Sequence, residues 1–256
     1  MLLAAIAFLA AEPAAATPAP APEASRLKAC LEQAQAEPAK AIPAASRWLA
    51  EAKGVARALP QQCLGQAYTS LQNWTAAHGA FLAARDAVAP SDRGARARLG
   101  AMAGNASLAA GDATTALAEL DDAVADASLI GDKALVGSIR ADDARALVSL
   151  GRNAVAAKVL DLARAEAPKD AQIWLLSATL ARRMGQLEQA RQQIANAAVL
   201  DRSDPAIGLE AGVIAELAGD EAAARASWQA VVAAAPDAPE GRSAKAYLAQ
   251  IGGSGG

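Results

Sequence analysis

The chain has 256 residues, of which 54% are hydrophobic but only 3% are aromatic, and its formal net charge is -3. Much of the hydrophobic share is alanine, which favours helices, whereas strands favour β-branched and aromatic residues, so we expect an all-helical fold. Charges of both signs are interspersed, which excludes the broad basic field that nucleic acid or an anionic membrane surface requires.

Residues 1–16 have the features of a secretory signal peptide. Leu2 to Ala11 form an uncharged apolar run, and Ala14, Ala15 and Ala16 suit a signal peptidase. The run is too short to span a bilayer, which takes about 20 residues. Since no Lys or Arg precedes it, a disordered Ala/Pro leader is the alternative. No later segment is apolar for long enough to anchor the mature chain, so we expect a periplasmic or secreted protein.

The segment after the signal peptide changes from a linker to helical periodicity. Residues 17–25 are rich in Pro and Ala and cannot bury a core, so they are expected to be a linker. Residues 26–56 are expected to form a first, altered helix pair. From there to Ile251, Ala-rich stretches alternate with short Gly, Asp or Pro breaks, and no strand-like alternation is present.

A period of 34 residues organises the second half of the chain. Gly151, Gly185 and Gly219 keep this spacing. The same phase is kept by Ala156, Ala190 and Ala224, by Leu160, Ile194 and Trp228, and by Ala163, Ala197 and Val231. Glycine adopts the left-handed conformation after a helix at no steric cost, and alanine lets two helix axes approach to about 8 Å. The large residues fill the space between the helices, and Pro168 and Pro236 end the second helices.

This pattern resembles the tetratricopeptide repeat, most clearly where Leu64, Gly65, Tyr68, Ala77, Phe81, Ala84 and Pro90 fall close to the spacing of that family. The resemblance implies an α-solenoid of stacked antiparallel helix pairs in a right-handed superhelix, with five repeats over residues 57–238. Residues 239–251 are expected to be a capping helix and residues 252–256 a flexible Gly/Ser tail. The steps from Ala77 to Ala116 and from Ala116 to Ala156 exceed 34 residues, which predicts extra residues in the second helices or in the links near Pro90 and Gly131.

The sequence contains no pattern typical of catalysis, metal binding or nucleotide binding. His78 is the single histidine, and no HExxH, CxxC or GxxxxGK[ST] motif is present. The adjacent acids Asp121 and Asp122, and Asp142 and Asp143, point in different directions on a helix and are expected to lie on solvated faces. Trp48, Trp74, Trp174 and Trp228 are expected to pack in the core or beside turns. We therefore predict that the protein is not an enzyme and has no cofactor or metal.

Cys30 and Cys63 allow two interpretations. Exported chains usually pair their cysteines. Both residues, however, fall on the first helices of successive pairs, whose axes lie about 8 to 10 Å apart, while a disulfide requires Cα atoms within about 7 Å. A disulfide and two buried thiols both remain possible.

In tetratricopeptide proteins the inner face of the first helices binds a peptide or partner protein, and the resemblance implies the same here. The residues expected to line this groove are Gln62, Gln66, Thr69, Arg98, Asn105, Arg145, Val148, Leu175, Thr179, Arg182 and Arg183. The arginines would suit acidic or carboxylate-ended peptides, and the alternative is that they lie on solvated faces. The predicted function is a monomeric periplasmic scaffold or adaptor. A small-ligand-binding or enzymatic protein with its site in residues 26–56 is the second hypothesis.

Overall fold

The computed structural model describes residues 22–253, and they contain thirteen α-helices, one 3₁₀ helix and no strand. The helices are α1 (Pro22–Ala36), α2 (Pro38–Glu51), η1 (Gly54–Arg57), α3 (Ala58–Ser70), α4 (Trp74–Ala87), α5 (Arg93–Ala109), α6 (Ala113–Leu129), α7 (Lys133–Ser149), α8 (Asn153–Glu166), α9 (Ala171–Arg183), α10 (Leu187–Leu200), α11 (Pro205–Leu217), α12 (Glu221–Ala234) and α13 (Pro239–Gly253). The predicted all-helical solenoid is confirmed.

The ends of the described chain differ from the expected boundaries. The predicted signal peptide, residues 1–16, lies outside the described residues, as do residues 17–21 and 254–256. Helix α1 begins at Pro22, inside the segment expected to be a linker, because proline is tolerated in the first turn of a helix, where its missing N–H has no partner to lose. Helix α13 continues to Gly253, beyond the expected end of the capping helix.

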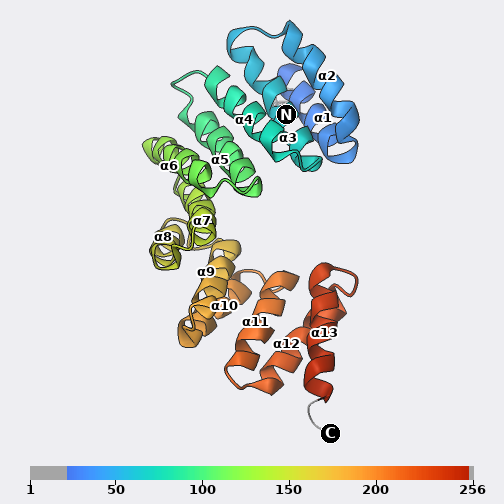
Figure 1. Cartoon of the computed structure of the whole chain (residues 1–256), viewed down its shortest axis with the longest axis vertical. Helices are drawn as coiled ribbons and strands as arrows, with labels where there is room; N and C mark the ends of the chain where they lie inside the picture. Colours follow the sequence, from blue (N-terminus) through green and yellow to red (C-terminus); the bar gives the residue numbers. More distant parts are fainter. Residues whose placement is uncertain (1–21, 254–256) are drawn as a thin grey trace, which may run out of the picture.

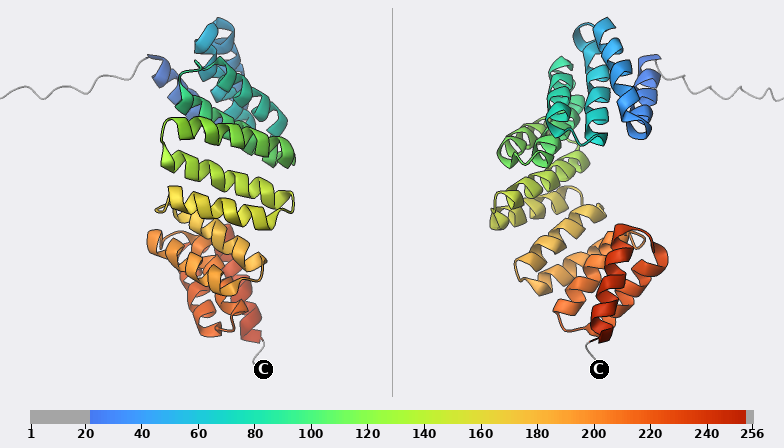
Figure 2. Two further views of the ribbon diagram at one scale, coloured as in Figure 1. Left: turned by 90° about the vertical axis from the view of Figure 1, so that its left-hand side faces the viewer. Right: turned by 45° about the vertical axis from the view of Figure 1, so that its right-hand side comes forward.

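The helices follow one another as pairs along an arc, and the two ends of the arc lie on the same side of the molecule (Figure 1). Extensive contacts join α3/α4, α5/α6, α7/α8, α9/α10 and α11/α12, α4 also packs closely on α5, and α13 packs against α12 and α11. First helices of successive pairs also touch, since α5 contacts α7, α7 contacts α9, and α9 contacts α11. Figure 2 shows the resulting stack from two further sides.

Each pair turns at a residue in the left-handed region, as the glycine spacing predicted. The φ angles are 88° at Gly111, 73° at Gly151, 75° at Gly185 and 79° at Gly219. In the α3/α4 turn the non-glycine residue Gln72 adopts a φ of 56°. An Asn or Asp then caps three of the second helices by accepting a hydrogen bond from a backbone N–H, as Asp112 does from Thr115 at 3.0 Å.

The seams between helices are built from small residues that face large ones. Ala156, Ala190 and Ala224 are fully buried, and Leu160, Ile194 and Trp228 are at most 6% exposed. Where a large side chain needs more room, the facing residue is glycine: a Cβ atom on Gly65 would collide with Phe81, and one on Gly212 would collide with Trp228. Alanine and glycine therefore decide how closely the helices approach.

The additional residues of the middle repeats lengthen both helices of the α5/α6 pair and the first helix, α7, of the next pair. Helices α5, α6 and α7 have 17 residues each, whereas the other helices from α3 to α12 have 13 or 14. The expectation placed the extra residues only in second helices or links, and it was wrong for the first helices α5 and α7. No proline lies between Pro90 and Pro168, so nothing in the sequence stops these helices earlier.

Cys30 of α1 and Cys63 of α3 form a disulfide, with Cα atoms 6.0 Å apart. Cys63 is fully buried and Cys30 is 9% exposed, and both belong to a core cluster with Ala34, Trp48 and Leu64. The close approach is possible because small residues line this seam. The bridge ties α1 to the first regular helix pair.

We expect removal of this bridge to lower the free energy of unfolding by about 3 kcal/mol, because the crosslink restricts the unfolded chain. Urea unfolding of the Cys30→Ala/Cys63→Ala variant, beside the oxidised protein, measures the loss. Dithiothreitol should destabilise the natural chain and leave the double variant unchanged. Two free thiols in the denatured, unreduced protein would contradict the pairing.

Candidate functional site

All eleven predicted groove residues lie on the first helices α3, α5, α7 and α9. They recur at equivalent positions: Gln66, Asn105, Arg145 and Thr179 each precede the turn residue of their pair by six positions. Because α5 contacts α7, α7 contacts α9, and residues of α3 and α5 line one depression, these positions share one side of the array. We call the surface formed by the eleven residues the inner face.

The amino-terminal part of the inner face contains a depression of about 200 Å³. Gln66, Thr69 and Asn105 form part of its lining, and Met102 and the buried ring of Phe81 give it an apolar side. The Thr69 hydroxyl donates to the Gly65 carbonyl at 2.9 Å and is thereby held in place. The depression combines an apolar surface with uncharged polar groups, a composition suited to an apolar side chain and the polar backbone next to it.

Sequence reasoning missed Met102 as a part of this surface. Met102 stands nine positions before Gly111, the turn residue of its pair, and Glu210 of α11 stands nine positions before Gly219. This shared position in the repeat could have identified both residues, neither of which was predicted from the sequence.

The middle of the inner face is a hydrogen-bonded network around Asp142. The Asn105 amide donates to Asp142 Oδ2 at 2.8 Å and thereby links α5 to α7. Arg145 forms an ion pair with the same carboxylate. Arg98, which is 56% exposed, lies 4.0 Å from Asp132 at the start of α7.

The carboxy-terminal part of the inner face holds a two-pronged ion pair between α9 and α11. Arg182 donates from Nε to Glu210 Oε1 at 2.6 Å and from Nη2 to Oε2 at 3.3 Å, and both side chains are largely buried. Val148 and Leu175 pack against core clusters instead of projecting freely, and Arg183 is exposed.

Three of the four predicted groove arginines, Arg98, Arg145 and Arg182, therefore already have a carboxylate partner. The pairs of Arg145 and Arg182 offset two of these positive charges at short range, which disfavours the hypothesis of a site for acidic peptides.

Two acidic residues differ from the expected solvated faces. Asp143 is only 4% exposed, and its Oδ1 has no hydrogen-bond partner among the described residues. Burial raises the pKa of Asp143 to about 7, the charges of Asp121 and Asp142 act in the same direction, and Arg140 opposes them. Asp142 accepts a hydrogen bond from Asn105 and forms an ion pair with Arg145. The expectation allowed for the different directions of neighbouring acids but assigned all of them to solvent, whereas α7 turns Asp143 into the α6/α7 seam.

His78 lies between second helices, in contact with an acid 41 residues away. Its Nε2 is 2.6 Å from Glu119 Oε1, and the Ser107 hydroxyl donates to Glu119 Oε2 at 3.0 Å. The carboxylate thus stands between the hydroxyl and the imidazole, which is not the order that activates a serine, where the imidazole contacts the hydroxyl. Within residues 22–253, no three or more His, Cys, Asp or Glu side chains gather to hold a metal ion, and no helix combines the length and apolarity of a membrane span.

The second hypothesis placed a small-ligand or enzymatic site in the first helix pair, where the structure has a depression of about 300 Å³ between α1 and α2. Arg26 at its edge forms an ion pair with Glu51 at 3.3 Å and lies over the Trp48 ring at 4.6 Å from the centroid. These contacts engage three of the lining side chains with one another.

Comparisons with known proteins agree with the architecture. No protein-family model matches the sequence, and no curated protein matches it. Among solved structures, the chain is similar to PilW, described as a widely conserved type IV pilus biogenesis factor, with a TM-score of 0.68, 16% identity and coverage of 86% of this chain and 97% of that one. It is similar to PilF of Pseudomonas aeruginosa, with a TM-score of 0.66, 14% identity and coverage of 88% and 97%. It is also similar to YrrB, described as a tetratricopeptide protein with an unusual peptide-binding site, with a TM-score of 0.50, 19% identity and coverage of 79% and 97%. The chain therefore has the fold of the tetratricopeptide-repeat solenoids.

Proposed function

We propose that this protein is a protein-interaction scaffold or adaptor that binds an extended segment of a partner along the inner face. The observation that carries the proposal is the depression between α3 and α5, where an apolar surface adjoins the side chains of Gln66, Thr69 and Asn105. Amides both donate and accept hydrogen bonds, so they suit a peptide backbone, and the apolar side suits one side chain of the segment. The similarity to a protein with a peptide-binding site and to a pilus biogenesis factor supports a binding role.

Site-specific crosslinking tests this proposal. A photoreactive p-benzoylphenylalanine at position 66, in the full chain produced in its natural host, is expected to give a discrete adduct with a partner protein. The matched control carries the same group at Lys158, which is exposed on the second helix α8. Met102→Glu should weaken binding of the identified partner at least tenfold with an unchanged circular dichroism spectrum, and Lys158→Glu should not. Equal adducts at both positions, or none at position 66, would contradict the proposal.

We further propose that the protein acts in the periplasm after removal of residues 1–16. The apolar run in those residues and the Cys30–Cys63 disulfide support export, since disulfides persist in oxidising compartments. The intact mass of the protein from a periplasmic fraction should correspond to a chain beginning near Thr17. A chain that begins at Met1 and stays in the cytosolic fraction would contradict export.

A further inference from the structure

Two neighbouring spaces in the array share four lining positions that the 34-residue period makes equivalent, but they differ greatly in volume. The first lies among α8, α9 and α10 and has a volume of about 10 Å³. The second lies among α10, α11 and α12 and has a volume of about 450 Å³. Residues at equivalent positions line both: Ser177 and Gln193 in the first correspond to Ala211 and Ser227 in the second. At all four shared positions the second space has the smaller side chain.

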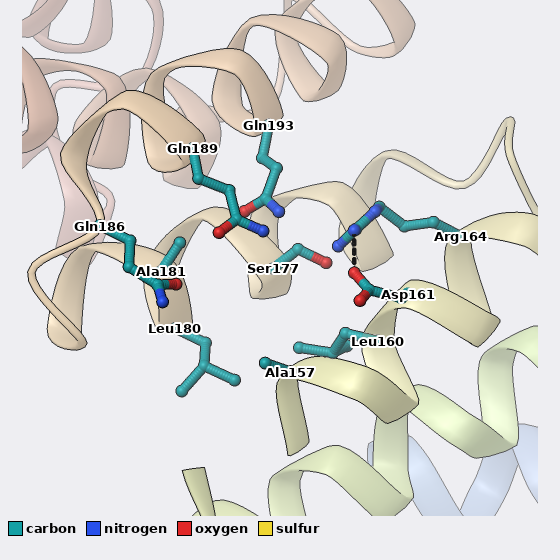
Figure 3. A pocket seen from close by; sticks show the side chains of 10 residues that line it. All are labelled: Ala157, Leu160, Asp161, Arg164, Ser177, Leu180, Ala181, Gln186, Gln189 and Gln193. Atoms are coloured by element: carbon teal, nitrogen blue, oxygen red, sulfur yellow. Dashed lines mark hydrogen bonds and ion pairs between the residues drawn. The ribbon is translucent and has the colours of Figure 1, made fainter. Parts of the chain in front are cut away.

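The first space is lined by large polar side chains, and an indole outside it lies against one of them. Arg164 and Asp161 form an ion pair on the α8 side, opposite Ser177 and Gln193 (Figure 3). The Arg164 guanidinium lies over the Trp174 ring, 5.1 Å from its centroid. The Trp174 N–H donates to the Pro168 carbonyl at 2.9 Å. An aromatic ring, a cation and a carbonyl acceptor together complete this inter-repeat junction.

The second space has no counterpart of the Trp174 indole, the Arg164 guanidinium or the Asp161 carboxylate. Gly208 stands at the position of Trp174, Ala198 at that of Arg164, and Ala195 at that of Asp161. Ile207 and Val231, which are 2% and 4% exposed, line the space deep in the molecule. At these three positions, one repeat therefore has a hydrogen atom and two methyl groups where the preceding repeat has an indole, a guanidinium and a carboxylate, which leaves room for the cavity.

The edge of the second space retains polar groups of the kind that surround Trp174. Arg202, at the position of Pro168, lines the cavity, and no hydrogen bond or ion pair is seen for its side chain within residues 22–253. Val199, on the same edge, is 73% exposed. The cavity thus joins a wall of small apolar residues to a guanidinium and an exposed apolar side chain.

We propose that the space among α10, α11 and α12 is a pocket for an aromatic side chain, tryptophan or tyrosine, of a partner protein. The ring would take the place that Trp174 occupies one repeat earlier. Its faces would contact the alanines and Val231, and Arg202 would supply the cation that Arg164 supplies to Trp174. A volume of about 450 Å³ lies within the range of roughly 300 to 1,000 Å³ typical of ligand sites. The pocket is separate from the inner face, so it would give the scaffold a second binding point.

A titration of the full chain with N-acetyltryptophanamide, followed by amide shifts in heteronuclear NMR spectra, tests the pocket. Saturable shifts are expected at Ala198, Ser203 and Gly208, and N-acetylleucinamide should bind at least tenfold more weakly because it offers no ring face to Arg202. The absence of saturable shifts, or equal binding of the leucine probe, would overturn the proposal. Shifts with indole but not with N-acetyltryptophanamide would also overturn it, since they would indicate a free aromatic molecule.

Two blocking variants locate the binding. Gly208→Trp/Val231→Ala recreates the Trp174 arrangement, in which Ala197 takes the place of Val231, and so relieves the contact of a residue 208 Cβ with Val231 Cγ2 at 2.6 Å. Ala195→Phe covers the cavity from α10 without altering a buried residue. At least one of them, folded by circular dichroism, should lose the probe by tenfold or more, whereas Ala154→Phe on α8 should retain it. If no folded blocking variant lost the probe, the binding would lie elsewhere and the proposal would be overturned.

Discussion

Asp126→Ala is expected to lower the free energy of unfolding by about 3 to 5 kcal/mol, since it removes the partner of two arginines at a buried position. The Asp126 side chain is 7% exposed and lies 2.6 Å from Arg93 Nη1 and 3.5 Å from Arg96 Nε. Arg96 is itself only 19% exposed, so its charge would remain in the α5/α6 seam without a carboxylate. Urea unfolding at pH 7 with the disulfide intact measures the effect.

Asp122→Ala provides the matched control on the same helix. Asp122 forms an ion pair with Arg85 at 3.2 Å, but its side chain is 66% exposed, and exposed pairs contribute about 0 to 1 kcal/mol. If both variants lost the same stability, burial of Asp126 would not explain its contribution.

Asp143→Asn is expected to stabilise the protein at pH 8 by an amount on the order of 3 kcal/mol, and to leave its stability unchanged near pH 4. The pKa of Asp143 is raised to about 7 in the folded chain, above its ordinary value of 3.8. The folded state therefore holds this proton more tightly than the unfolded state. The stabilisation from the protonated carboxyl is complete below about pH 4 and is lost as the pH rises to about 7. Asparagine has nearly the same shape and no charge to bury, so it should remove this loss.

Urea unfolding at several pH values between 4 and 8 measures this difference, with Asp122→Asn as a control on an exposed acid. If the urea midpoint of the natural chain did not fall between pH 4 and 7 relative to the midpoint of Asp143→Asn, Asp143 would be ionised in the folded chain without an energetic penalty. An equal gain in Asp122→Asn would assign the effect to the net charge of the protein.

The sequence alone determined the helix pairs and their register. Gly151, Gly185 and Gly219 take the left-handed conformation, and the alanines five residues later are fully buried, because backbone conformation and side-chain size are local properties. The same register placed the predicted groove residues on the first helices. It did not predict which side chains already have partners, since those partners come from other repeats: Glu210 meets Arg182 from 28 residues away, and Asp142 meets Asn105 from 37.

Only the tertiary structure decided the pairing of Cys30 with Cys63, the burial of Asp143 and the size of the cavity among α10, α11 and α12. Each depends on distances between helices that are not neighbours within a pair, or on how far one helix is rotated about its axis. The repeat spacing fixes which positions are equivalent. The side-chain volumes and charges that meet at a seam, however, come from several helices. For that reason the 34-residue period made positions such as Trp174 and Gly208 equivalent, and the unequal volumes around them became visible only when the helices were packed together.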